Sequence, residues 1–220
     1  MVPQGSISIL DPMKGPIITG TVSAHTHESL FGLDRNYMPQ PQLVEEWSVS
    51  PDSLTWTFKL RKGLTFHNGE PMNSRAAIGS WKRYSEFFAF GKVVAGFVAK
   101  VEAMDDLTFR FTLKEPTGLL PEVFPMFRVL PESQVGVSIA EGLKEVIGGG
   151  PYKFKKWSPG DRYVMERWAD YKPHPSPSSF HVGRKAAYLD EIHWIEVPDH
   201  ATRVAALETG EVHFLDEFKA

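Results

Sequence analysis

Apolar and polar residues alternate along several short stretches of this chain, which is the pattern of strands that bury one face. The clearest stretch is 54–61, in which leucine, tryptophan and phenylalanine alternate with threonine, lysine and arginine. The same period occurs within 101–113 and 152–168, and each of these is interrupted by a polar turn, which predicts two β-hairpins. The first turn contains Asp105 and Asp106 and lacks the glycine that makes such turns most favourable.

Two further stretches carry apolar residues at helical spacing, each after a residue that can cap a helix. Asn73 or Ser74 can cap the first helix, and Asp199 can cap the second, which a glycine ends. An apolar run over 192–197 predicts a buried strand before the second helix, and a further strand is expected from Val212. The end of the chain therefore predicts a β-α-β unit.

The remaining stretches are irregular in pattern. Prolines prevent 116–131 from forming one regular helix, and a short helical piece is expected over 138–147. Three glycines and a proline at 148–151 then change the direction of the chain, and 172–183 reads as a flexible segment. Hairpins together with a terminal β-α-β unit indicate an α/β or α+β fold.

Composition excludes several classes of function. With 220 residues and 42% hydrophobic content, the chain has the length of one large domain or two small ones. The formal charge of -3 leaves no basic field for nucleic acid, so we expect no nucleic-acid partner. The absence of cysteine excludes disulfides, thiolate metal sites and a cysteine nucleophile. No apolar run is long enough to span a bilayer, and the start lacks the pattern of a signal peptide.

Two blocks of sequence carry a resemblance. The first starts at Leu10-Asp11-Pro12, continues through HESLFGLD (27–34) and ends with the segment 41–77, which opens with PQLVEEWSVSPD. The second is GGGPYKFKKWSPGDRYVMERWADY (148–171), followed by 186–214. In order and separation these blocks resemble the peptide, dipeptide and nickel family (family 5) of ABC-transporter extracytoplasmic solute-binding proteins. Gly149 departs from the pattern, because the family usually has threonine there.

The resemblance implies a mixed α/β (α+β) fold of the type II periplasmic-binding-protein kind. It implies that residues 1–48 and 148–220 form the core of lobe I and that 49–147 form its accessory subdomain. Family members are more than twice as long as this chain, so we expect lobe II to be absent from it. The chain is then an N-terminal part, a fragment or one piece of a site that a second chain completes.

The same resemblance implies a function in transport. The protein would capture a peptide or similar small solute outside the cytoplasmic membrane and deliver it to the membrane permease of an ABC importer. It would be no enzyme, need no cofactor and reside in the periplasm or on the extracellular face, after removal of an export signal not present here. Ligand identity stays open among peptides, nickel complexes, opines and sugars, because the distinguishing groups lie largely in the absent half.

Candidate ligand-binding residues come from two segments. The resemblance implies that the stretch after Leu-Asp-Pro lines the cleft, with main-chain groups and hydroxyls of Thr19, Gly20, Thr21 and Ser23. It also implies that the Pro-rich loop, with Phe127 and Arg128, lies near the ligand. Independently, Arg128 stands alone among apolar residues, where a buried guanidinium needs an anion or several carbonyls; a ligand carboxylate would supply that partner. The alternative is an arginine that snorkels outward or pairs with a structural acid.

Two functions of other classes remain as alternatives. His25 and His27 form an HxH pair, which on a strand would place both rings on one side, as in a metal-dependent hydrolase. If 24–31 is helical, as the resemblance implies, the rings point about 200° apart, from a repeat of about 3.6 residues. No third ligand stands at suitable spacing, so no metal site is expected. A ligand-sensing domain of a regulator is the other alternative, without a DNA-binding helix pair here.

Overall fold

A computed structural model describes residues 7–14 and 17–215, with the side chains of 17–20 left out. In chain order the elements are α1 (Ile17–Thr26), β1 (Phe31–Leu33), β2 (Pro39–Pro41), β3 (Val44–Val49), β4 (Thr55–Leu60), α2 (Ser74–Phe87), α3 (Ala89–Phe97), β5 (Val98–Ala103), β6 (Thr108–Leu113), α4 (Leu119–Val123), the 3₁₀ turn η1 (Phe124–Met126), α5 (Glu132–Val135), β7 (Tyr152–Ser158), β8 (Arg162–Arg167), β9 (Glu191–Ile195) and α6 (His200–Glu208). No helix among the described residues has the length and apolar character of a bilayer span.

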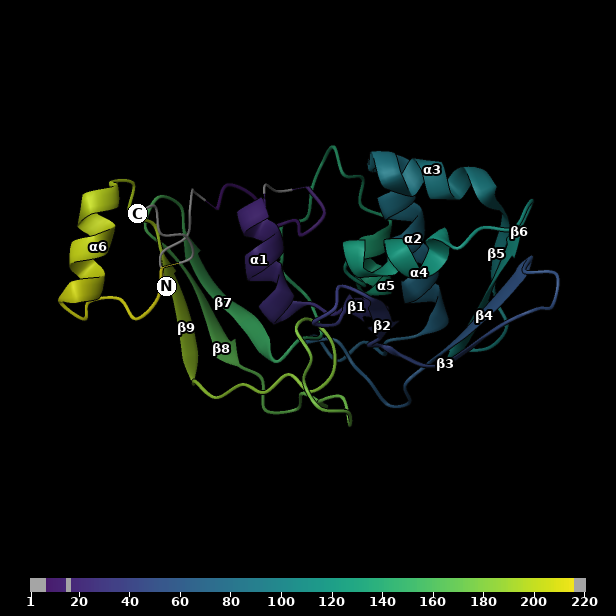
Figure 1. The fold of residues 1–220 in the computed structure, drawn as a ribbon. Coiled ribbons are helices and arrows are strands. Elements are labelled where there is room, and N and C mark those ends of the chain that lie inside the picture. Colours follow the sequence, from purple (N-terminus) through teal and green to yellow (C-terminus); the bar gives the residue numbers. More distant parts are fainter. Residues whose placement is uncertain (1–6, 15–16, 216–220) are drawn as a thin grey trace.

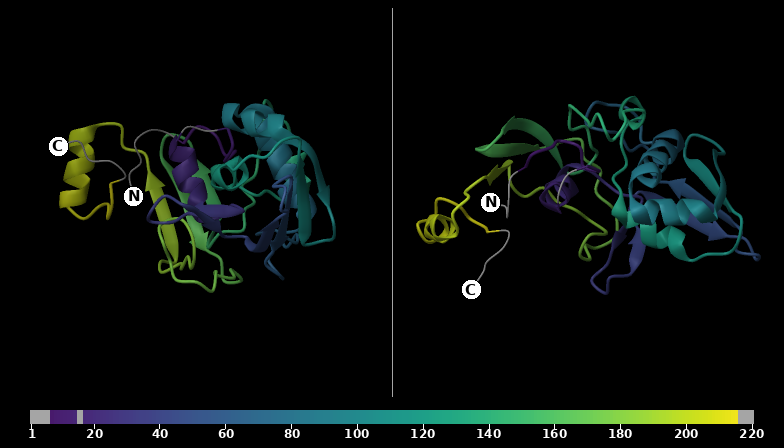
Figure 2. Two further views of the ribbon diagram at one scale, coloured as in Figure 1. Left: turned by 45° about the vertical axis from the view of Figure 1, so that its right-hand side comes forward. Right: turned by 90° about the horizontal axis from the view of Figure 1, so that it is seen from above.

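The elements form two groups, one around each larger sheet (Figure 1). A four-stranded sheet of order β3-β4-β6-β5 lies at one end with α2, α3 and α4 beside it. A three-stranded sheet of order β7-β8-β9 lies toward the other end, beyond which α6 projects. Helix α1 and the β1-β2 ribbon lie between the two groups, as the turned views of Figure 2 also show. The mixed α/β class expected from the sequence is thus confirmed.

The four-stranded sheet follows from the alternation along 54–61. In β4, Trp56, Phe58 and Leu60 are buried, and the polar residues between them are only partly covered. Phe109 and Phe111 of β6 pair across from Phe58 and Trp56, so aromatic rings line one face of the sheet. Such cross-strand aromatic pairs stabilise a sheet by about 0.2–1 kcal/mol each.

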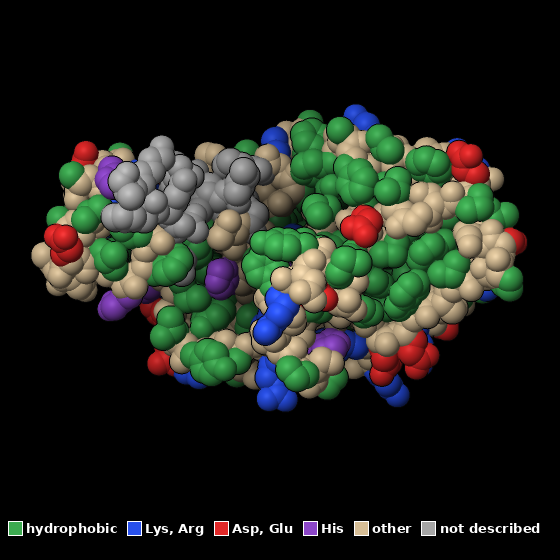
Figure 3. All heavy atoms as spheres, viewed as in Figure 1, with side chains coloured by type: hydrophobic (Ala, Val, Ile, Leu, Met, Phe, Trp, Pro, Cys, Tyr) green, Lys and Arg blue, Asp and Glu red, His purple; other side chains and the backbone are tan. Residues whose placement is uncertain are grey.

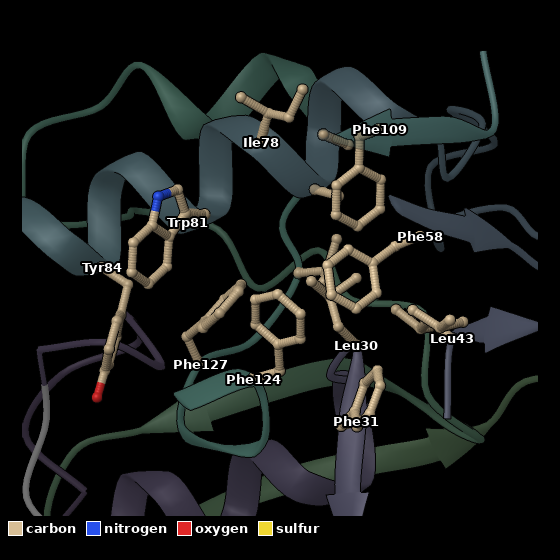
Figure 4. Close-up of a cluster of buried hydrophobic side chains, with 14 of the residues drawn as sticks. Leu30, Phe31, Leu43, Phe58, Ile78, Trp81, Tyr84, Phe109, Phe124 and Phe127 are labelled. Carbon is tan, nitrogen blue, oxygen red and sulfur yellow. The ribbon is translucent and has the colours of Figure 1, made fainter. Parts of the chain in front are cut away.

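Helix α2 covers the aromatic face of this sheet and closes the larger core (Figure 4). Trp81 packs against Phe111 and Phe127, with ring centroids 5.6 Å and 6.2 Å away. Burying one such large side chain stabilises the fold by about 1.5–3 kcal/mol, so the clustered rings contribute several increments of this size. The phenylalanines that are at most 1% exposed are Phe31, Phe58, Phe66, Phe109, Phe111, Phe124 and Phe127.

Side-chain caps fix the ends of these elements. The side chain of Asn73 accepts a hydrogen bond from the Ala76 amide at 2.9 Å and so begins α2, as predicted. The β5-β6 turn forms without glycine because the Asp105 carboxylate accepts the amides of Leu107 and Thr108, each at 2.8 Å. An aspartate can bond its own backbone in this way and replace the missing turn glycine.

The three-stranded sheet and α1 share a second, smaller core. The hairpin expected over 152–168 forms as β7 and β8, and β9 pairs with β8. Tyr152, Met165 and Trp194 face Val22 of α1 within this core. Helix α6 begins at the predicted cap, since the Asp199 carboxylate accepts the Thr202 amide at 2.7 Å.

Three local predictions are wrong among the described residues. Residues 138–147 form a turn and no helix. The Leu143 amide donates its hydrogen bond to the Asp11 carboxylate, and not to a backbone carbonyl one helical turn earlier. Residues 212–214 form no strand, since the Val212 amide donates back to the Ala206 carbonyl of α6; Leu215 is in a β-bridge, and residues 216–220 lie outside the described residues. Helix α1 ends at Thr26, so the helix expected over 24–31 gives way to extended chain and β1.

Asp11, from the first sequence block, belongs to a buried ion pair. The Asp11 carboxylate accepts hydrogen bonds from both terminal nitrogens of Arg83 on α2. The Asp11 side chain is 0% exposed and the Arg83 side chain is 3% exposed. The same carboxylate also accepts the amides of Met13 and Leu143. Asp11 therefore fastens the N-terminal segment to both α2 and the 138–147 turn.

Candidate ligand-binding cleft

A cleft of about 1060 Å³ lies between α1, β1, the segment after α4 and the loop 168–190 that joins β8 to β9. Its volume lies just above the range of sites that hold small molecules, about 300–1000 Å³. On the face shown in Figure 3, hydrophobic side chains gather over the larger core, and basic side chains lie lower, where this loop runs in Figure 1. The lining residues are Thr21, Ala24, His25, Glu28, Ser29, Phe31, Gly32, Leu33, Gln42, Pro125, Met126, Arg128, Pro151, Tyr152, Ser178, Phe180, His181, Arg184, Lys185, Ala186 and Tyr188.

Arg128 enters the cleft from the extended segment that follows η1. Its Nη1 donates to Ser29 Oγ at 2.8 Å and its Nε to Ser23 Oγ at 3.3 Å. Burial lowers the pKa of the Arg128 guanidinium, and the negative charge of Glu28 partly opposes that effect. The two hydroxyls fix the orientation of the guanidinium at the edge of the cleft.

Glu28 is the one acidic side chain in the described lining, and it is buried. Its Oε1 accepts the Tyr171 hydroxyl at 2.6 Å, and its Oε2 accepts Lys185 Nζ at 2.7 Å. Burial, with the nearby Glu28 charge and hydrogen bond, raises the pKa of the Tyr171 hydroxyl, so it stays a neutral donor. Glu28 thus ties two residues of the β8-β9 loop to the end of α1.

The β8-β9 loop is held against β1 at several points, although its first part reads as flexible in sequence. The Gln42 side chain accepts the Gly183 amide at 2.8 Å and donates to the Gly183 carbonyl at 3.3 Å. The His181 amide donates to the Leu33 carbonyl at 2.9 Å. A Cβ on Gly32 would lie 2.6 Å from the His181 carbonyl oxygen, so only glycine allows this approach. The loop is therefore a fixed wall of the cleft.

The residues predicted from sequence are distributed unevenly around this cleft. Thr21 and Arg128 line it. Ser23 is buried behind it and holds Arg128, while Phe127 lies in the larger core at 1% exposure. Phe127 has extended backbone, so consecutive side chains point to opposite sides, one to the core and the next to the cleft. Thr19 and Gly20 are in the first turn of α1, and their side chains lie outside the described residues.

Sequence reasoning missed the contribution of the β8-β9 loop and of the end of α1. Seven lining residues come from 178–188, of which only the last two belong to a recognised sequence block: Ser178, Phe180, His181, Arg184, Lys185, Ala186 and Tyr188. The available signal was the cluster of basic and aromatic residues at 180–188 between prolines and the final strand. That cluster is unusual for a solvated loop and could have been weighed as a site.

The two histidines of the HxH pair do not face one site. His25 lines the large cleft and packs edge-on to Trp194, whereas His27 lines a separate small cavity next to Val22 and Tyr163. Burial lowers the pKa of His27 to about 3, which keeps its ring neutral. Within residues 7–14 and 17–215 no group of three or more histidine or acidic side chains is placed to hold a metal ion.

The tryptophans mostly serve packing. Trp56 and Trp81 are 7% and 3% exposed, and Trp157 is partly buried beside the second core. Trp47 differs, because it lies on the edge strand β3 and is 44% exposed. It stacks on Trp56 with ring centroids 5.7 Å apart, and neither residue lines the cleft.

Comparison with known proteins gives the same family over most of the chain. Residues 38–220 match the family described as bacterial extracellular solute-binding proteins, family 5 Middle. The chain is 33% identical over 217 residues to the probable peptide ABC transporter periplasmic-binding protein y4tO of Sinorhizobium fredii, covering 96% of this chain and 41% of that protein. It is 29% identical over 218 residues to the glutathione-binding protein GsiB of Escherichia coli K12, and this match covers 95% of this chain and 40% of that protein.

Solved structures agree with this match. The periplasmic binding protein AgaA of A. tumefacien R10, in complex with agropinic acid, superposes with a TM-score of 0.80 at 26% identity and covers 96% of this chain and 42% of that one. DppA of Helicobacter pylori, in complex with the peptide STSA, shares the fold, with a TM-score of 0.77 at 23% identity. The match covers 96% of this chain and 44% of that one. The chain spans about two fifths of the length of the relatives it matches. By its sequence over 38–220 and by its fold, the chain belongs to the family 5 bacterial extracellular solute-binding proteins.

Proposed function

We propose that this chain supplies one wall of the solute site in the binding component of an ABC importer, and that it acts in transport and not as an enzyme. The observation that carries the proposal is the 1060 Å³ cleft, which combines apolar side chains with a few fixed polar groups. Ligand sites of this kind are lined mostly by apolar surface, with a small number of polar groups for orientation. The relatives named for peptide and glutathione binding support a peptide or a similar small solute.

The proposed mechanism is closure of two lobes over the solute. The described residues wall the cleft on several sides, and the proposed second lobe, from the rest of a longer protein or from a second chain, would cover its mouth. We place the described sheets in lobe I, with 1–48 and 148–220 as its core and 49–147 as the accessory subdomain. The closed form would be presented to the permease outside the cytoplasmic membrane, as the periplasmic relatives suggest.

Among the residues proposed to contact solute, Thr21 and Arg128 are supported by their place in the lining. Ser23 would act through Arg128, since it accepts the guanidinium Nε. Thr19, Gly20 and Phe127 lack that support: the first two have no described side chain, and Phe127 is in the core. No observation favours the metal-dependent hydrolase, because the rings of His25 and His27 face different cavities.

Calorimetric titration of the chain with a peptide mixture tests the proposal. Two-lobed sites bury roughly 70–90% of a small ligand, so this chain alone should bind weakly. Submicromolar affinity of the 220-residue chain would contradict the shared-site mechanism. Ala24→Trp, which fills the cleft, should remove the residual weak binding. Ala99→Trp, at an exposed position on β5, is the matched control and should leave it unchanged.

A further inference from the structure

A single histidine joins the two groups of elements at the three-glycine turn 148–150. His67 lies in the turn 66–70, which follows β4 and packs with the larger core. Its amide donates to the Gly148 carbonyl at 2.8 Å, and its ring Nε2 lies 3.0 Å from the Gly150 carbonyl oxygen. The Gly148 amide in turn donates to its ring Nδ1 at 3.3 Å. One residue therefore holds both ends of the turn that leads into β7.

These contacts require a neutral ring in one defined tautomer. The Gly150 carbonyl can only accept, so Nε2 carries the hydrogen, and the Gly148 amide can only donate, so Nδ1 is the acceptor. A second proton on Nδ1 would point at the Gly148 N–H, and two donors would then face each other. Protonation of His67 is therefore incompatible with the hydrogen bond from Gly148.

The turn is enclosed on its other side by the end of α1. The Gly150 amide donates to the Thr26 carbonyl at 2.9 Å. A Cβ on Gly148 would lie 1.9 Å from the same carbonyl oxygen and 2.9 Å from Cγ of the His27 ring. The turn thus lies between two histidines, His67 on one side and His27 on the other, with no room for a side chain on Gly148.

The wall of the cleft continues directly from this turn. Pro151 and Tyr152 are the next residues along the chain, and both line the cleft. Trp168, just after β8, donates its amide to the Pro151 carbonyl at 3.0 Å and packs edge-on to the His67 ring, with ring centroids 4.8 Å apart. Displacement of the turn would therefore move this part of the wall, whatever solute the cleft holds.

The surroundings of both rings disfavour a positive charge. Burial, and less strongly the charge of Lys153 on β7, lowers the pKa of His67 to about 4, although the hydrogen bond to Gly150 opposes this. Burial, with His67 and Arg128 acting in the same direction, lowers the pKa of His27 to about 3. A proton on either ring therefore acts against the other ring and against a neighbouring cation.

No acidic side chain among the described residues compensates either ring. The acids of the adjoining segments are engaged by other side chains or exposed: Glu28 accepts Tyr171 and Lys185, Glu70 accepts Asn68 and Ser133, Glu166 pairs with Lys153 and Lys155, and Asp170 is exposed. A charged ring in the closed turn would lack a counter-charge, so opening of the turn to water stabilises it.

We propose that His67 is an acid-sensitive joint: its neutral ring holds the 148–151 turn and the adjoining cleft wall in place, and its protonation releases them. The inference goes beyond the proposed function, because it concerns the regulation of the cleft's shape and does not depend on the identity of the solute. The enclosed ring has a pKa of about 4, and a ring exposed by opening has the ordinary value of 6.5. The closed turn is therefore most stable above pH 6.5 and becomes less stable as the pH falls toward 4.

Hydrogen exchange of the Gly148 and Gly150 amides measures the opening. With these two pKa values, titration of His67 alone favours opening about thirtyfold more at pH 5 than at pH 7.5. The protection factors of both amides, corrected for the intrinsic pH dependence of exchange, should fall by about that factor. They should also stay below those of the amides of β6 at both pH values, because the central strand exchanges only on global unfolding.

Variants assign the change to the ring at 67. His67→Gln cannot titrate but can still donate and accept at the turn, so the protection of Gly148 should change by less than about threefold between the two pH values. His213→Gln, at an exposed position after α6, is the matched control and should keep the thirtyfold change. If His67→Gln does not fold, ¹⁵N NMR of the ring nitrogens in the unmodified chain carries the test, and it should show the hydrogen on Nε2 of His67 at pH 7.

Three results would overturn the inference. The first is a fall in Gly148 protection that is equal in the unmodified chain and in His67→Gln. The second is a Gly148 protection factor equal to those of β6 at pH 5, since the turn would then open only by global unfolding. The third is a hydrogen on Nδ1 of His67 at pH 7. None of the three bears on the proposed function, which the calorimetric titration tests separately.

Discussion

The buried pair of Asp11 and Arg83 gives a direct test of how the N-terminal segment is held. Asp11→Asn keeps the shape of the side chain but leaves the Arg83 guanidinium buried without its counter-charge. It also replaces an acceptor oxygen by a donor, which then faces Arg83 together with the Met13 amide or the Leu143 amide. Removing one partner of a buried ion pair costs about 3–5 kcal/mol, because the remaining charge is uncompensated. Urea unfolding should show a loss of this size.

A double-mutant cycle distinguishes the pair from general damage at this position. Asp11→Asn combined with Arg83→Met leaves no unpaired charge, so the double variant should recover about 2 kcal/mol relative to the single change. Glu102→Gln, which breaks the exposed Lys100–Glu102 pair, is the control and should leave the unfolding midpoint unchanged. A loss below about 1 kcal/mol for Asp11→Asn would refute the assignment of Asp11 as a structural anchor.

Three further predictions concern stability and the loop wall. The pKa of His27 is about 3 in the folded protein and 6.5 in the unfolded chain. Folding therefore favours the neutral ring, so the free energy of unfolding is highest above pH 6.5 and decreases as the pH falls toward 3. In urea titrations, about 2 kcal/mol of the stability lost by pH 5 should be absent in His27→Gln and kept in exposed His213→Gln, and His67, whose pKa burial lowers to about 4, should add to the total loss. A Cβ at 149 meets chiefly the flexible end of Met72, with the Thr65 carbonyl oxygen at 3.2 Å, whereas one at 148 lies 1.9 Å from the Thr26 carbonyl oxygen. Gly149→Ala should therefore cost about 1–3 kcal/mol and be rescued by Met72→Ala, while Gly148→Ala should cost more and not be rescued. Gln42→Ala should speed exchange of the Gly183 amide roughly fivefold, from the loss of about 1 kcal/mol, and unchanged exchange would argue against the clamp.

The elements that alternation or capping defines locally could be predicted from the sequence. Strand β4 requires only its own period of two, and α2 and α6 begin at Asn73 and Asp199 because each side chain caps an amide three residues on. Even the β5-β6 turn without glycine has a local cause, the Asp105 carboxylate. These features depend on neighbours in the chain, which a single sequence displays.

The parts that sequence reasoning missed depend on partners far away in the chain. The 138–147 segment loses its expected helix to a bond between Leu143 and Asp11, 132 positions apart. The β8-β9 loop is fixed by Gln42–Gly183 and Glu28–Lys185, at separations of 141 and 157 positions. Such contacts override local propensity and produce no periodic pattern in the sequence. The third of the lining that this loop supplies was therefore invisible, whereas Arg128, singled out from the sequence, does line the cleft.

The central claim is that solute binds in the cleft between α1 and the β8-β9 loop. Methionine methyl groups report on it directly, because Met126 lines the cleft and is 50% exposed, while Met104 is 47% exposed on the β5-β6 turn. In ¹³C-methyl-methionine NMR of the chain, peptides added at millimolar concentration should shift the Met126 signal and leave Met104 in place. A Met126 signal that does not move, or a Met104 signal that moves equally, would contradict the account.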